Sequence, residues 1–364
     1  MRENLLKEKE SNPNLLGLVK QDILPVRKKI AIVGLGVAGS YLLNRLSNDH
    51  DVTGYEMQKE GEFQAICAWG TSRHELSKIM KPLGIDFEKY VLFNGKDMVV
   101  DLGSKKPRHI PLKGLVTYDK HALEVDLTKG KDAIYGTRVT PSLLKDKNYD
   151  MIIDCTGLYR SFLPKIKEDL WIPCVEYKVA YEKMPYEDFY IKPFEGLAGY
   201  FWLFPLEDGN AYVGAGDYHK HHNEALNEFN AKYPGQILKK IGRPIRISPP
   251  KYCEPFSVGN VVGCGESIGT VFPLLGEGII PSLQCAEILC SNLEDMEAYR
   301  DQVLKKFEYF NYVYDLIKLK FAGKFSMVKH LPLMLKTYGA MKKMEDRFGL
   351  EVRMSDFKEI VSTY

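Results

Sequence analysis

The feature that most constrains the fold is a glycine pattern close to the start of the chain, Gly34-x-Gly36-x-x-Gly39. Such glycines allow a tight turn, a close approach of the backbone to a pyrophosphate, and close packing of a helix on a strand. An apolar strand-like run precedes the pattern, a helical stretch follows it, and an acid comes about 20 residues later. These segments are Ile30–Val33, Val37–Leu46, a second strand at Val52–Tyr55, and Glu56. Together they predict a dinucleotide-binding unit rather than an incidental glycine-rich turn.

This unit also narrows the choice of cofactor. A helix that begins at Val37 and Ala38 would direct its free N–H groups and its positive dipole end at the phosphates. Glu56 and Met57 end the second strand, where a carboxylate accepts hydrogen bonds from the adenosine ribose hydroxyls. A carboxylate there disfavours a 2′-phosphate and therefore NADP, which leaves FAD and NAD open.

A second glycine-rich segment, near residue 270, favours FAD. Five glycines lie in a loop between a strand end at Val262 and a helix that begins near Gly278; they are Gly263, Gly265, Gly269, Gly276 and Gly278. So many glycines imply that the backbone lies close to a flat or anionic group. A helix N-terminus at this point would stabilise the negative charge on N1 of a reduced isoalloxazine ring.

Composition excludes several other classes of protein. The 364 residues are 45% hydrophobic and 27% charged, which is typical of a globular protein with two domains or one interrupted domain. A formal net charge of +2 without a base-reading motif gives no reason to expect nucleic acid. No apolar run suits a bilayer span, and the start of the chain lacks the core of a secretory signal. Seven scattered cysteines without a CxxC pair predict no metal site, so we expect a cytoplasmic protein.

The segment Cys67–Ser72 leads into a predicted helix, with Thr71 or Ser72 as its cap. Because it directly follows the ribose-binding strand, it should return toward the cofactor. A lone cysteine is more often an inert core residue, but a helix N-terminus favours a thiolate and gives Cys67 a functional interpretation.

The middle of the chain predicts further strands. Short antiparallel strands are expected between residues 90 and 115, and a buried strand at Tyr149–Thr156 ends beside Gly157. Asp154 lies at the carboxyl end of that strand, which favours a cofactor contact over a turn-forming role. Gly199–Pro205 and Ala211–Ala215 form a predicted hairpin, whose aromatic side chains suit either a plain core or one wall of an apolar pocket.

The residues after 296 are helical in pattern and basic, with aromatic side chains interleaved among lysines. Packed surface helices, whose lysines cover apolar surface, are the simpler interpretation. The alternative is a foot that contacts an anionic membrane surface.

Five segments together resemble the geranylgeranyl reductase family, flavoproteins that share the p-hydroxybenzoate hydroxylase fold. In chain order they are GLGVAGS with Glu56, CAWGTSRHEL, YDMIIDCTGLYRS, GYFWLFPLEDGNAYVGAG and GCGESIGTVFPLLGEGIIPSLQCAEIL. The most specific parts are the Tyr-x-Trp-x-Phe-Pro signature and the Gly-Glu-Gly-Ile loop. This chain departs from the family at Glu266, where relatives have aspartate, and at Lys120, where they usually have arginine.

The resemblance implies an α/β fold with a Rossmann-like FAD-binding domain interrupted by an antiparallel-sheet substrate domain. The expected boundaries are 28–160 with 250–298 for the FAD-binding domain, 161–249 for the substrate domain, 299–364 for a C-terminal helical region and 1–27 for a leader.

It also implies FAD-dependent saturation of the C=C bonds of a geranylgeranyl-type lipid chain. Cys67 would donate or relay the proton, with His74 as a second candidate. Tyr200, Trp202, Phe204 and Pro205 would bind the chain. The FAD ligands would be Gly34, Gly36, Val37, Ala38, Gly39, Glu56, Met57, Cys67, Ala68, Asp154, Gly157, Gly265, Glu266, Gly276, Glu277, Gly278 and Ile279.

The implied partners are an isoprenoid lipid, an electron donor such as NAD(P)H or ferredoxin, and a membrane surface at the periphery. Two other functions stay open. One is a flavin monooxygenase of the same fold, against which the aromatic wall lacks a charged clamp for a phenol or carboxylate. The other is a non-redox relative, either a cyclase that keeps flavin or a lipid-binding protein.

Overall fold

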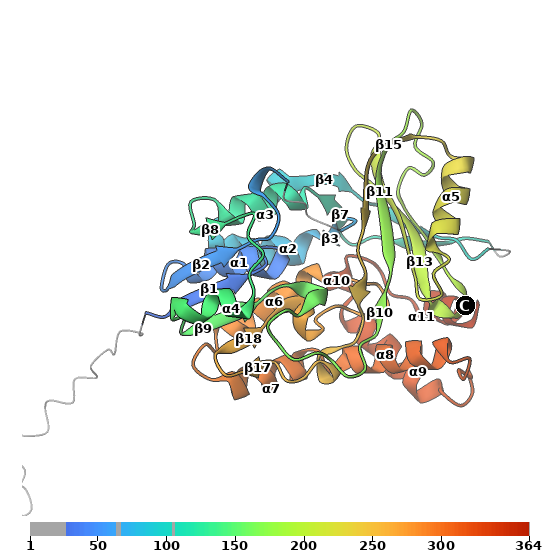
Figure 1. Cartoon of the computed structure of the whole chain (residues 1–364). Coiled ribbons are helices and arrows are strands. Elements are labelled where there is room, and N and C mark those ends of the chain that lie inside the picture. Colours follow the sequence, from blue (N-terminus) through green and yellow to red (C-terminus); the bar gives the residue numbers. More distant parts are fainter. Residues whose placement is uncertain (1–26, 63–66, 104–105, 364) are drawn as a thin grey trace, which may run out of the picture.

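The computed structural model describes residues 27–62, 67–103 and 106–363. Two large sheets stand side by side, and helices from the C-terminal part of the chain lie along one end of both (Figure 1). Except for Arg27, the expected leader lies outside the described residues.

The first sheet has six strands in the order β17-β18-β9-β1-β2-β8, all parallel except β17. Its strands are β1 (Lys29–Val33), β2 (Asp51–Tyr55), β8 (Ala133–Ile134), β9 (Met151–Asp154), β17 (Ser257–Val258) and β18 (Val261–Gly263). Val33 lies opposite both Tyr55 and Asp154, so the carboxyl ends of the three central strands are aligned. This register brings the loops after β1, β2 and β9 to one edge of the sheet.

Helices cover this sheet in the arrangement expected of a dinucleotide-binding domain. Helix α1 packs against both α3 and α6. The short helix α4 comes between β8 and β9 in the chain. Their bounds are α1 (Val37–Leu46), α3 (Lys120–Thr128), α4 (Pro141–Leu144) and α6 (Ile279–Cys290). The predicted strand–turn–helix–strand unit at the start of the chain is therefore confirmed.

The second sheet has seven strands in the order β15-β11-β14-β13-β12-β5-β6, antiparallel except between β12 and β5. They are β5 (Asp97–Val100), β6 (Arg108–Pro111), β11 (Cys174–Ala180), β12 (Phe189–Pro193), β13 (Gly199–Pro205), β14 (Asn210–Asp217) and β15 (Gln236–Gly242). The predicted hairpin is β13–β14. The sequence did not predict that β5 and β6 would extend this sheet instead of pairing with β4 (Val91–Asn94) and β7 (Leu115–Tyr118), which are close to them in the chain. One face packs against α5 (His222–Lys232).

Two small sheets connect the large ones. The strands β3 (Gly70–Ser72), β7 (Leu115–Tyr118) and β4 (Val91–Asn94) form one, and β10 (Trp171–Ile172) pairs with β16 (Ile245–Arg246) in the other. Helix α2 (Arg73–Met80) follows β3, and the Ser72 side chain accepts a hydrogen bond from Glu75 N. Of the two caps that the sequence left open, Thr71 and Ser72, the structure therefore selects Ser72.

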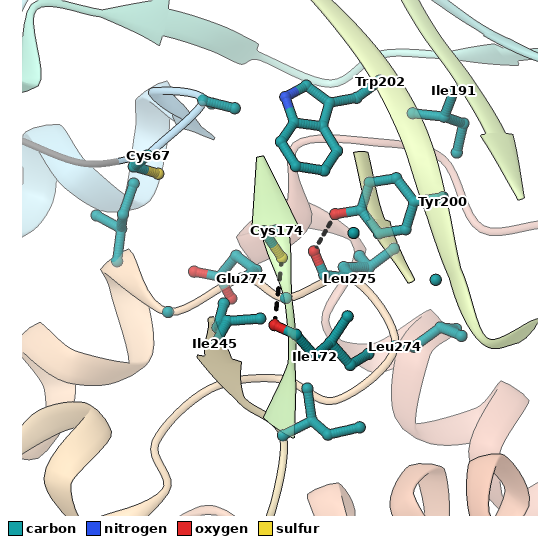
Figure 2. A pocket seen from close by; sticks show the side chains of 18 of the residues that line it. Cys67, Ile172, Cys174, Ile191, Tyr200, Trp202, Ile245, Leu274, Leu275 and Glu277 are labelled. Carbon is teal, nitrogen blue, oxygen red and sulfur yellow. Dashed lines mark hydrogen bonds between the residues drawn. The ribbon is translucent and has the colours of Figure 1, made fainter. Parts of the chain in front are cut away.

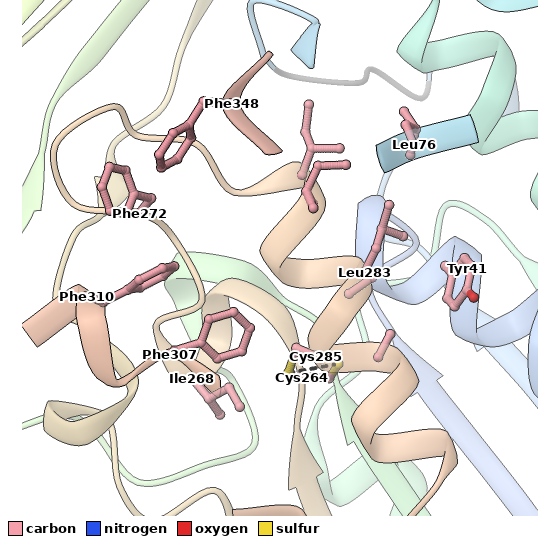
Figure 3. Packing of buried hydrophobic residues seen from close by; sticks show 14 of the residues in the cluster. Tyr41, Leu76, Cys264, Ile268, Phe272, Leu283, Cys285, Phe307, Phe310 and Phe348 are labelled. Atoms are coloured by element: carbon pink, nitrogen blue, oxygen red, sulfur yellow. Dashed lines mark hydrogen bonds between the residues drawn. The ribbon is translucent and has the colours of Figure 1, made fainter. Parts of the chain in front are cut away.

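The residues after 296 are helical, as expected: α7 (Met296–Lys306), α8 (Glu308–Phe321), α9 (Leu331–Lys343), α10 (Glu345–Phe348) and α11 (Met354–Thr363). Within the part of the chain that the structure describes, every helix is too short or too polar to cross a membrane. Phe310 and Phe348 from this region pack against Phe272 of the glycine-rich loop, and Phe307 packs against Phe310 (Figure 3). The C-terminal helices therefore share one hydrophobic core with the parallel sheet.

Candidate functional site

A cavity of about 490 Å³ lies at the aligned carboxyl ends of β1, β2 and β9. It extends from Glu56 and Met57 past the turn at Gly34 and Gly36 to the N-terminus of α6. Val37, Ala38, Gly157, Gly276, Gly278 and Ile279 also line it. The sequence-predicted loops after these strands and before α6 therefore meet around one elongated space.

The three glycines of the first turn have separate roles. A Cβ at Gly34, whose φ is +91°, would lie 2.6 Å from the carbonyl oxygen of Cys155. A Cβ at Gly39 would lie 1.8 Å from the carbonyl oxygen of Gly34, so this glycine packs α1 against the turn and does not line the cavity. A Cβ at Gly36 would meet no atom within 4 Å, which leaves open space beside the backbone. These are the turn, packing and close-approach roles that the motif predicted.

Glu56 is held at the end of the cavity by the backbone. Its Oε2 accepts a hydrogen bond from Leu35 N at 2.9 Å, and its Oε1 accepts one from Gln58 N at 3.1 Å. Each carboxylate oxygen retains a further lone pair. The side chain is thus fixed in place with acceptor capacity left for hydroxyl groups.

Asp154 has the turn-forming role and does not line the cavity. It is fully buried, and its Oδ1 accepts hydrogen bonds from the backbone N and the Oγ1 of Thr156 at 3.0 and 2.6 Å. Its Oδ2 accepts a further bond from Phe162 N at 2.8 Å. The cofactor contact expected of Asp154 is therefore wrong, because its carboxylate is used to fold the loop. Gly265 is likewise buried away from the cavity, against Ala38.

Glu266 lines the cavity but its carboxylate is already paired. Its Oε2 accepts a hydrogen bond from Arg243 Nη2 at 2.8 Å, and its Oε1 accepts one from Arg246 N at 2.9 Å. Arg243 lies over Gly157, where a Cβ would come within 2.2 Å of Nη2. Sequence reasoning missed Arg243, because it follows β15 and no local motif surrounds it.

A second, mainly apolar cavity of about 280 Å³ lies against the seven-stranded sheet. It shares Cys67, Arg243, Ile245, Gly276 and Gly278 with the first cavity, so the two meet there. Figure 2 shows Tyr200 and Trp202 on the sheet side and Cys67 across from them. Phe204 and Ala68 also line it, whereas Pro205 is buried at the end of β13 and does not.

The aromatic wall results from paired rows across β11, β14 and β13. Glu176, Gly214 and Trp202 lie directly opposite one another in one row. Residues in such a row project from the same face of a sheet. A Cβ at Gly214 would lie 2.2 Å from the Trp202 ring, so the absence of a side chain there lets the indole lie over the sheet. The Tyr200 hydroxyl donates a hydrogen bond to the Leu275 carbonyl oxygen, which connects the wall to the glycine-rich loop.

A third cavity of about 110 Å³ continues the apolar one toward the C-terminal helices. The two share Met98, Ile191, Leu197, Tyr200 and Leu274 among their lining residues. Phe357, Ile360 and Val361 of α11 line its far part. Apolar lining therefore extends from the junction at Cys67 to the last helix.

Glu277 lines the apolar cavity rather than the dinucleotide cavity. Its Oε1 accepts a hydrogen bond from Ile280 N at 3.0 Å in the first turn of α6, and its Oε2 accepts one from Arg347 Nη2 at 2.9 Å. Burial raises the pKa of this carboxyl, and the positive charge of Arg347 opposes the rise. The role expected of Glu277 as a cofactor ligand is therefore replaced by an ion pair with the C-terminal region.

The two sequence-derived acid candidates lie in different environments. Burial raises the pKa of the Cys67 thiol to about 11, although the charge of Lys120 lowers it. The structure gives the thiolate interpretation no support, because β3 separates Cys67 from the start of α2 and burial favours the neutral thiol. His74 is exposed on α2 and lines none of the three cavities, so the structure gives it no place in the site.

Sequence reasoning also missed Glu176, which lines the apolar cavity and is 6% exposed. Burial raises the pKa of its carboxyl to about 8. The available signal was the alternation of Cys174, Glu176 and Lys178 with Val175 and Tyr177 in one predicted strand region. That alternation marks a face but does not say whether the face meets solvent or a cavity.

No family model matches this chain. It is 25% identical over 330 residues to an uncharacterized protein of Methanocaldococcus jannaschii, covering 77% of this chain and 88% of that protein. It is 30% identical over 168 residues to digeranylgeranylglycerophospholipid reductase 2 of Methanothermobacter thermautotrophicus, covering 44% of this chain and 42% of the reductase.

Solved structures show the same fold. A geranylgeranyl bacteriochlorophyll reductase-like protein from Thermoplasma acidophilum superposes with a TM-score of 0.63 at 16% identity, covering 88% of this chain and 99% of that protein. A probable FAD-dependent monooxygenase from Pseudomonas aeruginosa gives a TM-score of 0.58 at 14% identity, covering 82% of this chain and 99% of that one. The predicted fold class and the resemblance are confirmed: this chain has the geranylgeranyl reductase-like fold of FAD-dependent oxidoreductases.

Proposed function

We propose that this protein is an FAD-dependent oxidoreductase that saturates C=C bonds of an isoprenoid lipid chain. The observation that carries the proposal is the junction of the two cavities at Cys67, Gly276 and Gly278. An apolar chain in the second cavity would meet the far end of a dinucleotide in the first. The partial similarity to a digeranylgeranylglycerophospholipid reductase supports the same substrate class.

The residues of the first cavity fit FAD. Glu56 would accept hydrogen bonds from the ribose hydroxyls, and the open space at Gly36 with the N-terminus of α1 would accommodate the pyrophosphate. The backbone at Gly276 and Gly278, next to the N-terminus of α6, would lie against the ring system. When bound, FAD supplies the hydride for the reduction.

The protein's own part in the reaction is to exclude water, orient the chain and supply a proton. An isolated alkene is a poor hydride acceptor, so a proton must reach one carbon as the hydride reaches the other. Tyr200, Trp202 and Phe204 would hold the chain, and the third cavity would extend the space for its length. The neutral thiol of Cys67 is available as a donor or relay. If Cys67→Ala retains full turnover with unchanged FAD content, that role is wrong.

We further propose that electrons come from NAD(P)H or ferredoxin, because the sequence carries no second dinucleotide fingerprint. We also propose a peripheral membrane contact for a protein of the cytoplasm. Val328, Leu331 and Leu335 are 86%, 50% and 50% exposed near lysines of the same region. Exposed apolar side chains beside lysines suit an anionic lipid surface.

The monooxygenase alternative has less support from the site. Arg243 lies at the junction, where a cation would clamp a phenol or carboxylate, but its guanidinium is paired with Glu266. Oxygen-dependent consumption of NAD(P)H with a hydroxylated product would favour this alternative. A flavin that no unsaturated lipid reoxidises would instead indicate the non-redox cyclase or lipid-binding alternative.

The first experiment is an absorption spectrum of the purified protein, with the released cofactor identified after denaturation. We expect tightly bound FAD at close to one per chain. Anaerobic reduction, addition of digeranylgeranylglyceryl phosphate and mass analysis should then show the lipid gaining hydrogen in pairs. A colourless protein that FAD cannot reconstitute would contradict the proposal.

A further inference from the structure

Glu176 is a buried acid with one carboxyl oxygen left unpaired in the part of the chain that the structure describes. It lies in β11, within the seven-stranded sheet, and lines the apolar cavity. Its Oε1 is buried and has no hydrogen-bond partner among the described residues. Buried polar atoms are nearly always paired in folded proteins, and leaving one unpaired costs free energy. An unpaired carboxyl oxygen on an acid that lines a cavity therefore points to a group that meets a ligand.

Trp202 lies in the same row of paired residues as Glu176, and its side chain extends toward Glu176. The indole lies over Gly214, the residue between them, because a Cβ there would lie 2.4 Å from Cε2 and 2.9 Å from Nε1. Trp202 Nε1 is also buried, and its N–H acts on the Glu176 carboxyl as a hydrogen-bond donor that lowers the carboxyl pKa. One donor and one acid thus lie side by side on a wall that is otherwise apolar.

The surroundings of the Glu176 carboxyl favour its protonated form. Burial raises its pKa to about 8, against smaller opposing effects from the Trp202 N–H and from Lys120 and Lys239. Three further titratable groups interact electrostatically with Glu176, whose negative charge would raise their pKa values. They are Cys67, Cys174 and Tyr212. With a pKa of about 8, against about 11 for the Cys67 thiol, Glu176 is the stronger acid of these two groups.

We propose that Glu176 is the catalytic acid that donates a proton to the substrate alkene. This inference rests on the proposed reductase function. In the balanced step the C=C π bond and the Glu176 O–H bond break, one carbon gains the proton, and the other gains a hydride from reduced flavin. The substrate is reduced by two electrons, the flavin is oxidised, and Glu176 is left as a carboxylate that regains a proton from solvent. A reduced carrier such as NAD(P)H or ferredoxin restores the flavin.

The test compares Glu176→Gln with Cys67→Ala and with a control, Glu182→Gln, whose exposed side chain lies just beyond the end of β11. The holoenzyme is reduced with dithionite and mixed with digeranylgeranylglyceryl phosphate. We expect Glu176→Gln to lose at least about 100-fold in rate, the lower end for general acids, with unchanged FAD content. The loss should exceed that in Cys67→Ala, and Glu182→Gln should keep the wild-type rate. Turnover of Glu176→Gln within threefold of wild type overturns the inference.

A second readout does not depend on turnover. Infrared difference spectra should show the C=O stretch of a protonated carboxyl at neutral pH, which titrates near pH 8 and is missing in Glu176→Gln. A wild-type spectrum without this band overturns the inference while the reductase function stands. A wild-type protein that binds FAD but saturates no prenyl chain would contradict the proposed function itself. This outcome can be distinguished from a failure of the Glu176 inference, because it is measured on the wild type alone.

Discussion

At the scale of single residues, Glu176 makes the stability of the fold depend on pH. Its pKa is about 8 in the fold and near 4.5 when unfolded, so the folded state binds the extra proton between these values. Stability should therefore fall as pH rises from about 4.5 to about 8, by at most about 1.4 kcal/mol per pH unit.

Glu176→Gln removes this titration and should flatten the dependence. The measurement is the melting temperature of both proteins at pH 6 and pH 9, where the wild type should lose more than the variant. Equal losses in the two proteins would show that Glu176 keeps an ordinary pKa.

Gly214 is a second residue whose role can be tested, because its lack of a side chain makes room for the Trp202 ring. In Gly214→Ala the new methyl group would overlap the Trp202 ring, so the indole must move away from the sheet. Overpacking of this kind costs about 1–3 kcal/mol. We expect lower stability, an altered tryptophan fluorescence spectrum and a raised KM for the prenyl lipid. Gly339→Ala in α9 is the control, since a Cβ there meets nothing within 4 Å: the fluorescence spectrum and the KM should stay unchanged, and stability should rise by about 0.5–1 kcal/mol because alanine favours a helix interior over glycine.

At the scale of elements, different glycines of the turn between β1 and α1 serve cofactor binding and folding. Gly36→Val should fold normally, because open space lies beside the backbone, but should bind FAD at least about tenfold more weakly. Gly39→Ala should instead destabilise the domain, because its Cβ would overlap the Gly34 carbonyl group. FAD titration and thermal unfolding of both variants distinguish the two effects. Equal loss of stability in both would mean that Gly36 is also needed for packing.

At the scale of the whole molecule, the ion pair between Glu277 and Arg347 joins the glycine-rich loop to the C-terminal helices. The two side chains are only 16% and 4% exposed. Arg347→Met leaves a buried carboxylate uncompensated and should cost about 3–5 kcal/mol.

The variant should therefore melt at a lower temperature and be cleaved by protease between α8 and α11. Arg353→Met is the control, because its pair with Glu351 is on the surface and its loss should leave the melting temperature unchanged. Equal behaviour of the two variants would show that the C-terminal helices are held by apolar packing alone.

The local elements of the dinucleotide-binding unit were predictable, and so were the β13–β14 hairpin and the cap at Ser72. Each depends on residues only a few positions apart. The pairing of β5 and β6 with the second sheet was not predictable, because the same alternating pattern suits an edge strand of either large sheet. Nor does a local pattern show that the apolar space continues beneath α11.

By itself, the sequence determined the strand–turn–helix unit, the acid at Glu56 and the second glycine loop. Turn glycines, caps and strand patterns act through local backbone conformation, which neighbouring residues fix. Only the tertiary structure decided that Asp154 folds a loop, that His74 is exposed, that Arg243 covers Gly157 and that Glu176 lines a cavity with one carboxyl oxygen unpaired. Burial and ion pairing depend on which distant strands and helices meet, and they set the protonation state of a side chain.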